Sequence, residues 1–124
     1  MRRLEIIADG VRIVARLRET PTAERIWLAL PIAARVSTWG DEIYFATPVQ
    51  CAREADAKDV VDAGEIAFWP DGDAIAIGFG PTPISQGSEI RLASPCNVWA
   101  DAEGDVRDFG RVRSGASVTV RALD

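Results

Sequence analysis

The sequence predicts a mainly β protein folded as a single domain over residues 1–124. Short apolar or alternating runs separated by turn residues recur along most of the chain, and only one segment has helical periodicity. The chain is also 48% hydrophobic. A chain of this length buries about two-thirds of its unfolded surface, so a core of its own is expected without a stabilising disulfide or metal.

The N-terminal segment predicts a β-hairpin. Leu4–Ala8 and Val11–Leu17 are apolar or alternating runs, and Asp9-Gly10 stands between them. An Asp-Gly pair between two such runs is the strongest short-range hairpin signal. We therefore expect the fold to open with two antiparallel strands.

One amphipathic helix is expected next, over about residues 21–30. Thr20 supplies a hydroxyl cap and Pro21 takes the first helical position. The apolar stripe has the spacing i, i+3, i+4 and i+7 and consists of Ala23, Ile26, Trp27 and Leu30. Trp27 is accordingly expected in the core. Pro31 ends the helix, because its ring disfavours helical geometry at the preceding residue.

Beyond the helix the pattern is almost entirely that of strands bounded by turns. The expected strands are Ala34–Thr38, Glu42–Ala46, Gly64–Trp69, Ala74–Phe79, Asn97–Ala100, Val106–Phe109 and Val118–Ala122. Short strands at this spacing favour a closed barrel or a sandwich, which the single helix caps or flanks. Residues 52–62 form either a charged loop or a short helical turn and receive no role.

Alternation along the strands assigns their side chains to two faces. The face expected to line the barrel interior carries Ile43, Phe45, Ile66, Phe68, Ile75, Ile77 and Phe79. The other face places Tyr44 and Trp69 outward, beside a ledge of small residues formed by Ala74, Ala76 and Gly78. Large aromatics with polar tips on an outer face are candidates for a binding surface. The alternative is that a loop or helix covers them.

Composition excludes several kinds of chemistry. The chain has no His, which excludes Ser/His/Asp and Cys/His catalysis by this chain alone, and zinc sites that need His. Its two Cys cannot form a Cys₄ zinc site. Asp101, Glu103 and Asp105 lack the spacing of a calcium loop, so we expect no metal and no cofactor. A net charge of −5 opposes binding to nucleic acid.

The N-terminus and the hydropathy pattern indicate a soluble protein. Arg2 and Arg3 are followed by neither the apolar segment nor the cleavage site of a signal peptide. There is no run of about 18 apolar residues, so no membrane association is expected. The expected location is the cytoplasm, where Cys51 and Cys96 would be free thiols.

Three segments resemble a family of small prokaryotic cyclophilin-like proteins. They are STWGDEIYFATPV (37–49), GEIAFWPDGDAIAIGFGPTPIS (64–85) and SPCNVWAD (94–101). The segment TPTAERIWLAL (20–30) is similar to the helix opening of cyclophilins. The resemblance covers the chain from the first hairpin to about residue 100. It implies a closed antiparallel barrel of eight strands with a capping helix, and no established activity.

The departures from true cyclophilins concern their activity. Those enzymes use a catalytic Arg, with Gln, Phe, Trp and His lining a proline pocket. This chain has no His, no Gln stands in the strand 74–79, and Arg35 is not matched to the catalytic position. Prolyl isomerisation needs a donor to the prolyl nitrogen beside an apolar pocket. Most of that apparatus is missing.

Two functions therefore stay open. In the favoured one, a non-catalytic binding protein holds a small metabolite or peptide in a groove formed by Trp39, Glu42, Tyr44, Trp69 and Thr82. The alternative is an enzyme, either a vestigial prolyl isomerase or a small-molecule hydrolase using Glu42 and Tyr44.

Two of these groove residues have further alternatives. Glu42 and Glu65 would form a carboxylate pair for acid/base work if their strands were neighbours, and the alternative is a solvent-facing role opposite Arg35 or Arg91. Thr82 either offers its hydroxyl at the mouth of the groove or forms a turn.

Overall fold

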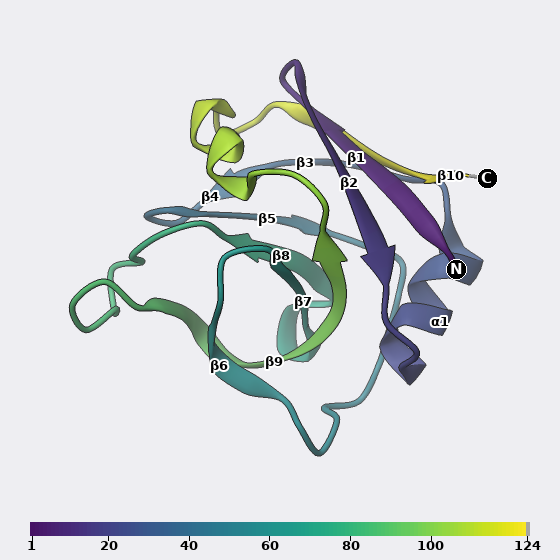
Figure 1. The fold of residues 1–124 in the computed structure, drawn as a ribbon, viewed down its shortest axis with the longest axis horizontal. Coiled ribbons are helices and arrows are strands. Elements are labelled where there is room, and N and C mark those ends of the chain that lie inside the picture. Colours follow the sequence, from purple (N-terminus) through teal and green to yellow (C-terminus); the bar gives the residue numbers. More distant parts are fainter. Residues whose placement is uncertain (124) are drawn as a thin grey trace.

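The strands form a nearly closed antiparallel barrel with one main helix at its side (Figure 1). The structure is a computed structural model and describes residues 1–123. The strands are β1 (Arg3–Ala8), β2 (Val11–Leu17), β3 (Ile32–Arg35), β4 (Ser37–Thr38), β5 (Glu42–Ala46), β6 (Lys58–Val61), β7 (Glu65–Trp69), β8 (Ala74–Gly78), β9 (Ile90–Ala102) and β10 (Ser117–Leu123). The helices are α1 (Pro21–Ala29) and two short 3₁₀ helices, η1 (Pro70–Gly72) and η2 (Val106–Arg111).

The barrel closes through one bent segment, residues 32–38. The order of the strands around the sheet is β3-β10-β1-β2-β9-β7-β8-β5-β4, so β3 and β4 are its two ends. Only Val36 separates them, and its N–H donates to the carbonyl of Ala116. Counted as one bent strand, β3 and β4 complete a ring of eight strands, with β6 paired only to β9. The predicted fold class is confirmed.

The opening hairpin is confirmed and supplies the middle of the sheet. β1 pairs along its whole length with β2 and with β10. Asp9 and Gly10 both have a positive φ, of 49° and 82°, as a two-residue hairpin turn requires.

The barrel interior follows the predicted alternation. The fully buried members of the main core include Ile43, Phe45, Ile66, Phe68, Ile75 and Ile77, and Phe79 packs against them partly buried. Trp99 and Phe109, which the sequence analysis did not assign to the core, are also fully buried in it.

Three segments differ from the sequence prediction. The strand predicted over 106–109 is wrong, because these residues belong to η2, in which Val106 and Phe109 are the buried side chains. Their spacing of three matches the 3₁₀ repeat, in which i and i+3 lie one above the other. β9 begins at Ile90 rather than Asn97, and β6 lies within the unassigned residues 52–62. β6 pairs only with β9, so local propensity gives little sign of it.

The helix is confirmed, but the role of Trp27 is not. The Thr20 Oγ1 accepts a hydrogen bond from the Ala23 N–H at 3.0 Å, and Ala23 and Ile26 are buried. Trp27 is only half-buried, and the guanidinium of Arg2 lies 5.2 Å from its ring centroid. Trp27 therefore lies at the edge of the contact between α1 and the barrel, where the Arg2 guanidinium covers its ring. Within residues 1–123 no helix is long and apolar enough to span a membrane.

A buried polar network connects α1, the loop before β6 and β9. Asn97 is fully buried; its Oδ1 accepts from the Glu54 N–H at 2.8 Å and its Nδ2 donates to Thr22 Oγ1 at 2.9 Å. The Thr22 hydroxyl donates in turn to the Glu54 carboxylate. The same carboxylate accepts from the Thr22 N–H, which satisfies an unpaired amide at the start of the helix. These bonds hold the loop that leads into β6.

Candidate functional site

A recess on the outer face of the barrel brings together four of the five predicted site residues. It has a volume of about 200 Å³ and is lined by Trp39, Glu42, Tyr44, Trp69, Ala76, Ala93 and Cys96. We call it the aromatic groove. Thr82 is the predicted residue that does not line it.

The strand register explains how the floor of the aromatic groove forms. Tyr44 on β5 stands opposite Ala76 on β8, and Trp69 on β7 stands opposite Ala74. β8 therefore separates the two aromatic side chains with small residues only. Because these side chains are short, the surface over β8 is lower than the aromatic rings on either side, which leaves a depression.

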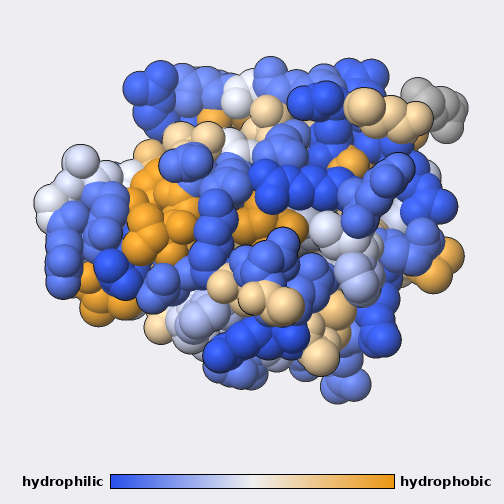
Figure 2. Space-filling view, turned by 60° about the horizontal axis from the view of Figure 1, so that its bottom comes forward, coloured by the Kyte–Doolittle hydropathy of each residue, from blue (hydrophilic) through white to orange (hydrophobic). Residues whose placement is uncertain are grey.

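The first half of β9, together with β6, covers part of the same outer face. Val61, Ala67, Ile90, Leu92 and Cys96 form a second buried cluster here, with Trp69 and Val98 packed against it partly buried. A Cβ atom at Gly78 would lie 2.4 Å from Ile90 Cγ2, so this covering strand requires glycine beneath it. Figure 2 shows a hydrophobic patch on one face of the molecule with hydrophilic residues above and below it. The sequence analysis left open whether Tyr44 and Trp69 form a binding surface or are covered by other segments. Each alternative applies in part, because β6 and β9 cover the sheet beside the groove while the groove itself remains hollow.

Glu42 is a buried carboxyl group without a partner. Glu42 is 6% exposed, and its Oε1 has no hydrogen-bond partner among residues 1–123. Burial alone raises the pKa of the Glu42 carboxyl to about 7. Glu5 shows the contrast, because it is equally buried but its carboxylate binds both Arg12 and Arg121.

Glu42 and Glu65 form no carboxylate pair, and the expected solvent-facing role of Glu42 is wrong, because Glu42 is buried. β8 lies between β5 and β7, so the two strands are not neighbours. Glu65 instead binds Arg18 and Lys58 and accepts from the Asp62 N–H. Against the effect of burial, the Asp62 hydrogen bond and the two bases lower the pKa of its carboxyl. The alternative partners of Glu42 are engaged elsewhere, since Arg35 donates to the carbonyl of Gly115. Arg91 forms ion pairs with Asp59 and Glu89.

Local contacts hold the two Trp side chains at the groove. The Trp69 indole Nε1 donates to Ser94 Oγ at 2.8 Å, and a Cβ at Gly72 would lie 2.4 Å from the same indole ring. The Trp39 N–H donates to the Glu42 carbonyl at 3.0 Å across a tight turn. Gly40 occupies that turn with a φ of 58°. The turn keeps Trp39 beside Glu42.

Cys96, like Ala93, lines the groove although the sequence analysis did not place it there. Its Sγ donates to the Ser94 carbonyl at 3.3 Å, and burial raises the pKa of the thiol to about 12. A thiol of this kind stays protonated at neutral pH and is a poor nucleophile. Both Cys51 and Cys96 are free thiols in the structure.

Thr82 has the turn-forming role. It is 6% exposed, its hydroxyl donates to the Arg91 carbonyl, and its N–H donates to Ser85 Oγ at 2.8 Å. These bonds tie the loop after β8 to the start of β9. Thr82 therefore shapes the region beside the aromatic groove without lining it.

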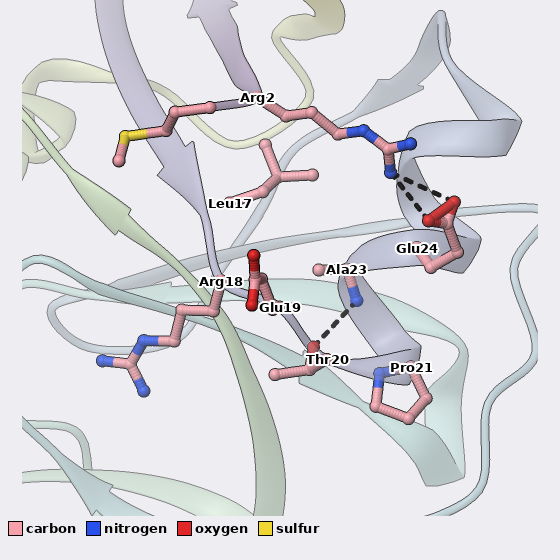
Figure 3. A pocket seen from close by; sticks show the side chains of 9 residues that line it. Arg2, Leu17, Arg18, Glu19, Thr20, Pro21, Ala23 and Glu24 are labelled. Carbon is pink, nitrogen blue, oxygen red and sulfur yellow. Dashed lines mark hydrogen bonds and ion pairs between the residues drawn. The ribbon is translucent and has the colours of Figure 1, made fainter.

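A larger depression lies between the end of the first hairpin and the start of α1 (Figure 3). Its volume is about 1010 Å³, but most of its polar side chains already have partners. Arg2 binds Glu24 at 2.8 Å, and Thr20 caps Ala23. Arg18 points away from the helix in Figure 3 and binds Asp101. The aromatic groove is the better candidate site because it contains a buried polar atom with no partner.

The sequence of the chain matches a known protein family. Residues 2–121 match the family described as Cyclophilin-like, and the chain belongs to that family. The resemblance of the three sequence segments is thereby confirmed. Among curated proteins, none matches this chain.

Two solved structures are similar to the chain. The solution structure of the hypothetical protein AF2241 from Archaeoglobus fulgidus has 40% sequence identity and a TM-score of 0.83. The match covers 97% of this chain and 93% of that one. The structure of McbB in complex with tryptophan has 16% identity and a TM-score of 0.68, covering 95% of this chain and 44% of that one. At this identity McbB shares the fold alone.

Proposed function

We propose that this cyclophilin-like protein binds a small metabolite, or a single side chain of a peptide, in the aromatic groove without transforming it. The observation that carries the proposal is the unpartnered Oε1 of Glu42 at the wall of an otherwise aromatic and apolar recess. A buried polar atom without a partner is unfavourable in the empty protein and is satisfied when a ligand supplies the bond.

The size of the groove sets the scale of the ligand. A volume of about 200 Å³ holds roughly seven water molecules at about 30 Å³ each. This is less than the usual site for a drug-sized molecule, which suits a small metabolite or the end of a larger one. McbB, which shares the fold over 44% of its chain, is in complex with tryptophan, and L-tryptophan is therefore chosen as the first probe.

The test is an NMR titration with L-tryptophan and a panel of small metabolites, followed by affinity measurements on two variants. Trp69→Ala is expected to weaken the strongest binder by about 2 kcal/mol or more, as hot-spot residues do. Its stability is expected to fall by less than the roughly 3–5 kcal/mol of a core aromatic deletion.

Phe68→Ala is the matched control, since Phe68 is fully buried in the barrel interior on the opposite face of β7. Equal and large destabilisation by both substitutions would contradict the role of Trp69 as a groove wall. Titrations in which no panel member shifts the signals of the groove residues would contradict the proposed function.

A second candidate is a hydrolase-like activity in the same groove, supported by the pKa of about 7 at Glu42 beside Tyr44. A carboxyl group with a pKa near the working pH suits general acid or base catalysis. Turnover of small ester or amide substrates that disappears in Glu42→Gln would favour this candidate over pure binding.

A further inference from the structure

We propose that the ligand of the aromatic groove carries an organic cation, an ammonium group, which lies among the three aromatic side chains and binds Glu42. This inference rests on the proposed function and specifies the class of ligand. It is carried by the combination of aromatic walls with one buried, unpartnered carboxyl group.

The walls suit a cation. Trp39, Tyr44 and Trp69 come from three different elements, namely the turn after β4, β5 and β7, and they surround one small recess. The faces of aromatic rings carry partial negative charge, and Trp attracts cations most strongly of the three aromatic residue types. The other lining residues are Ala76, Ala93 and Cys96.

The charges around the groove also favour a cation. No Lys or Arg of residues 1–123 lines the recess, and Glu42 is the carboxyl group that does. Asp59 and Asp71 act electrostatically on the adjacent Cys96, against one base, Arg53. Arg53 and Asp71 are 3.9 Å apart at the surface and partly neutralise each other, and Asp59 is paired with Arg91. The negative charge that remains without a cationic partner at the groove is that of ionised Glu42.

The two other ligand classes fit less well. An anion would enter beside a desolvated carboxyl group with no cation to hold it. A purely apolar ligand would displace water and leave the Glu42 Oε1 unpartnered. An ammonium group favours the ionised form of the carboxyl and compensates its charge, and a protonated amine also donates an N–H to this oxygen. The alkyl substituents of the cation contact the aromatic walls.

The test compares probes of the same shape and different charge. Choline is titrated by NMR against its neutral isostere 3,3-dimethylbutan-1-ol, with 3,3-dimethylbutanoate as the anionic probe. We expect choline to bind at least about tenfold more tightly than the neutral alcohol, a ratio that corresponds to about 1.4 kcal/mol. The anion should bind most weakly.

Variants then assign the preference to Glu42. Glu42→Gln should reduce choline affinity to about that of the alcohol while leaving the alcohol within about a factor of two. Glu65→Gln removes a carboxylate that lies outside the groove and should leave both affinities unchanged. The resonances of the Trp39 and Trp69 indoles report whether binding is in the groove, and the spectrum of each variant reports its folding.

Failure of this inference differs from failure of the proposed function. If the alcohol or the anion shifts the groove resonances with an affinity equal to or above that of choline, the groove binds ligands but the cation assignment is wrong. If neither these probes nor the metabolite panel shifts those resonances, both proposals are wrong.

Discussion

The buried Glu42 predicts how stability depends on pH. Its pKa rises on folding from an ordinary 4.5 to about 7. Between these values the unfolded chain loses the proton while the folded chain retains it, so the unfolded state binds fewer protons and stability falls as pH rises. Above about pH 7 the carboxyl is ionised in both states, and the full loss of stability is present. Below pH 4.5 it is protonated in both states, and there is no loss of stability.

The magnitude follows from the size of the shift. One pKa unit corresponds to about 1.4 kcal/mol, so a shift of this size lowers the free energy of unfolding by about 3 kcal/mol once both states are ionised. Glu42→Gln removes the titration and keeps a side chain of similar shape. The unmodified protein should therefore lose stability between pH 5 and pH 8, whereas Glu42→Gln should not. The difference in the free energy of unfolding between the two proteins should grow by about 2–3 kcal/mol over this range, in favour of Glu42→Gln.

Urea unfolding at several pH values, with the slope m held common, measures this difference. Glu65→Gln is the matched control, because the Asp62 N–H, Lys58 and Arg18 lower the pKa of the Glu65 carboxyl. At neutral pH, Glu65→Gln should have a lower free energy of unfolding than the unmodified protein. This difference should shrink as the pH falls through the acidic range. Parallel pH profiles for Glu42→Gln and the unmodified protein would refute the reasoning.

Three other predictions concern activity, the thiols and the polar network. A protease-coupled assay on an X-Pro peptide should detect no useful prolyl isomerase activity, and a kcat/KM within about 10⁴–10⁸ M⁻¹s⁻¹ would overturn this expectation. Thiol titration of the unfolded, unreduced protein should count both Cys51 and Cys96; recovering neither would indicate a disulfide. Asn97→Ala should lower the free energy of unfolding by about 1–3 kcal/mol in a urea melt, because Glu54 and Thr22 lose their buried partner. An unchanged midpoint would mean that water replaces the amide.

Local patterns in the sequence predicted the parts of the fold that local physics determines. The Asp9-Gly10 hairpin and the alternation along β5, β7 and β8 each depend on residues within one or two strands, and all are present in the structure. β6 and the first half of β9 were missed because they are stabilised by pairing with each other, between segments about 30 residues apart. The same omission explains why Cys96 was not assigned to the groove.

The aromatic side chains of the groove and the position of Glu42 were predictable, whereas the burial of Glu42 was not. Alternation places Glu42 on the outer face of β5, where an acid is ordinarily solvated. Its burial arises from the groove itself, formed by Trp39, Cys96 and the other wall residues. Only the assembled tertiary structure removes water from this carboxyl group.

The energetic cost of burying Glu42 also bears on whether the groove is a binding site or only a gap in the packing of the surface. For stability alone, a neutral side chain at this position would avoid the desolvation of a carboxyl group, as the expected behaviour of Glu42→Gln expresses. Glu5 shows that this chain can hold an equally buried carboxylate with two arginines. At Glu42 no such cation is supplied by residues 1–123, although the groove has room for one to enter from outside. Groups that oppose stability and lack compensation within the fold are concentrated at functional sites. Under the proposed function, the ligand supplies the missing partner of Glu42.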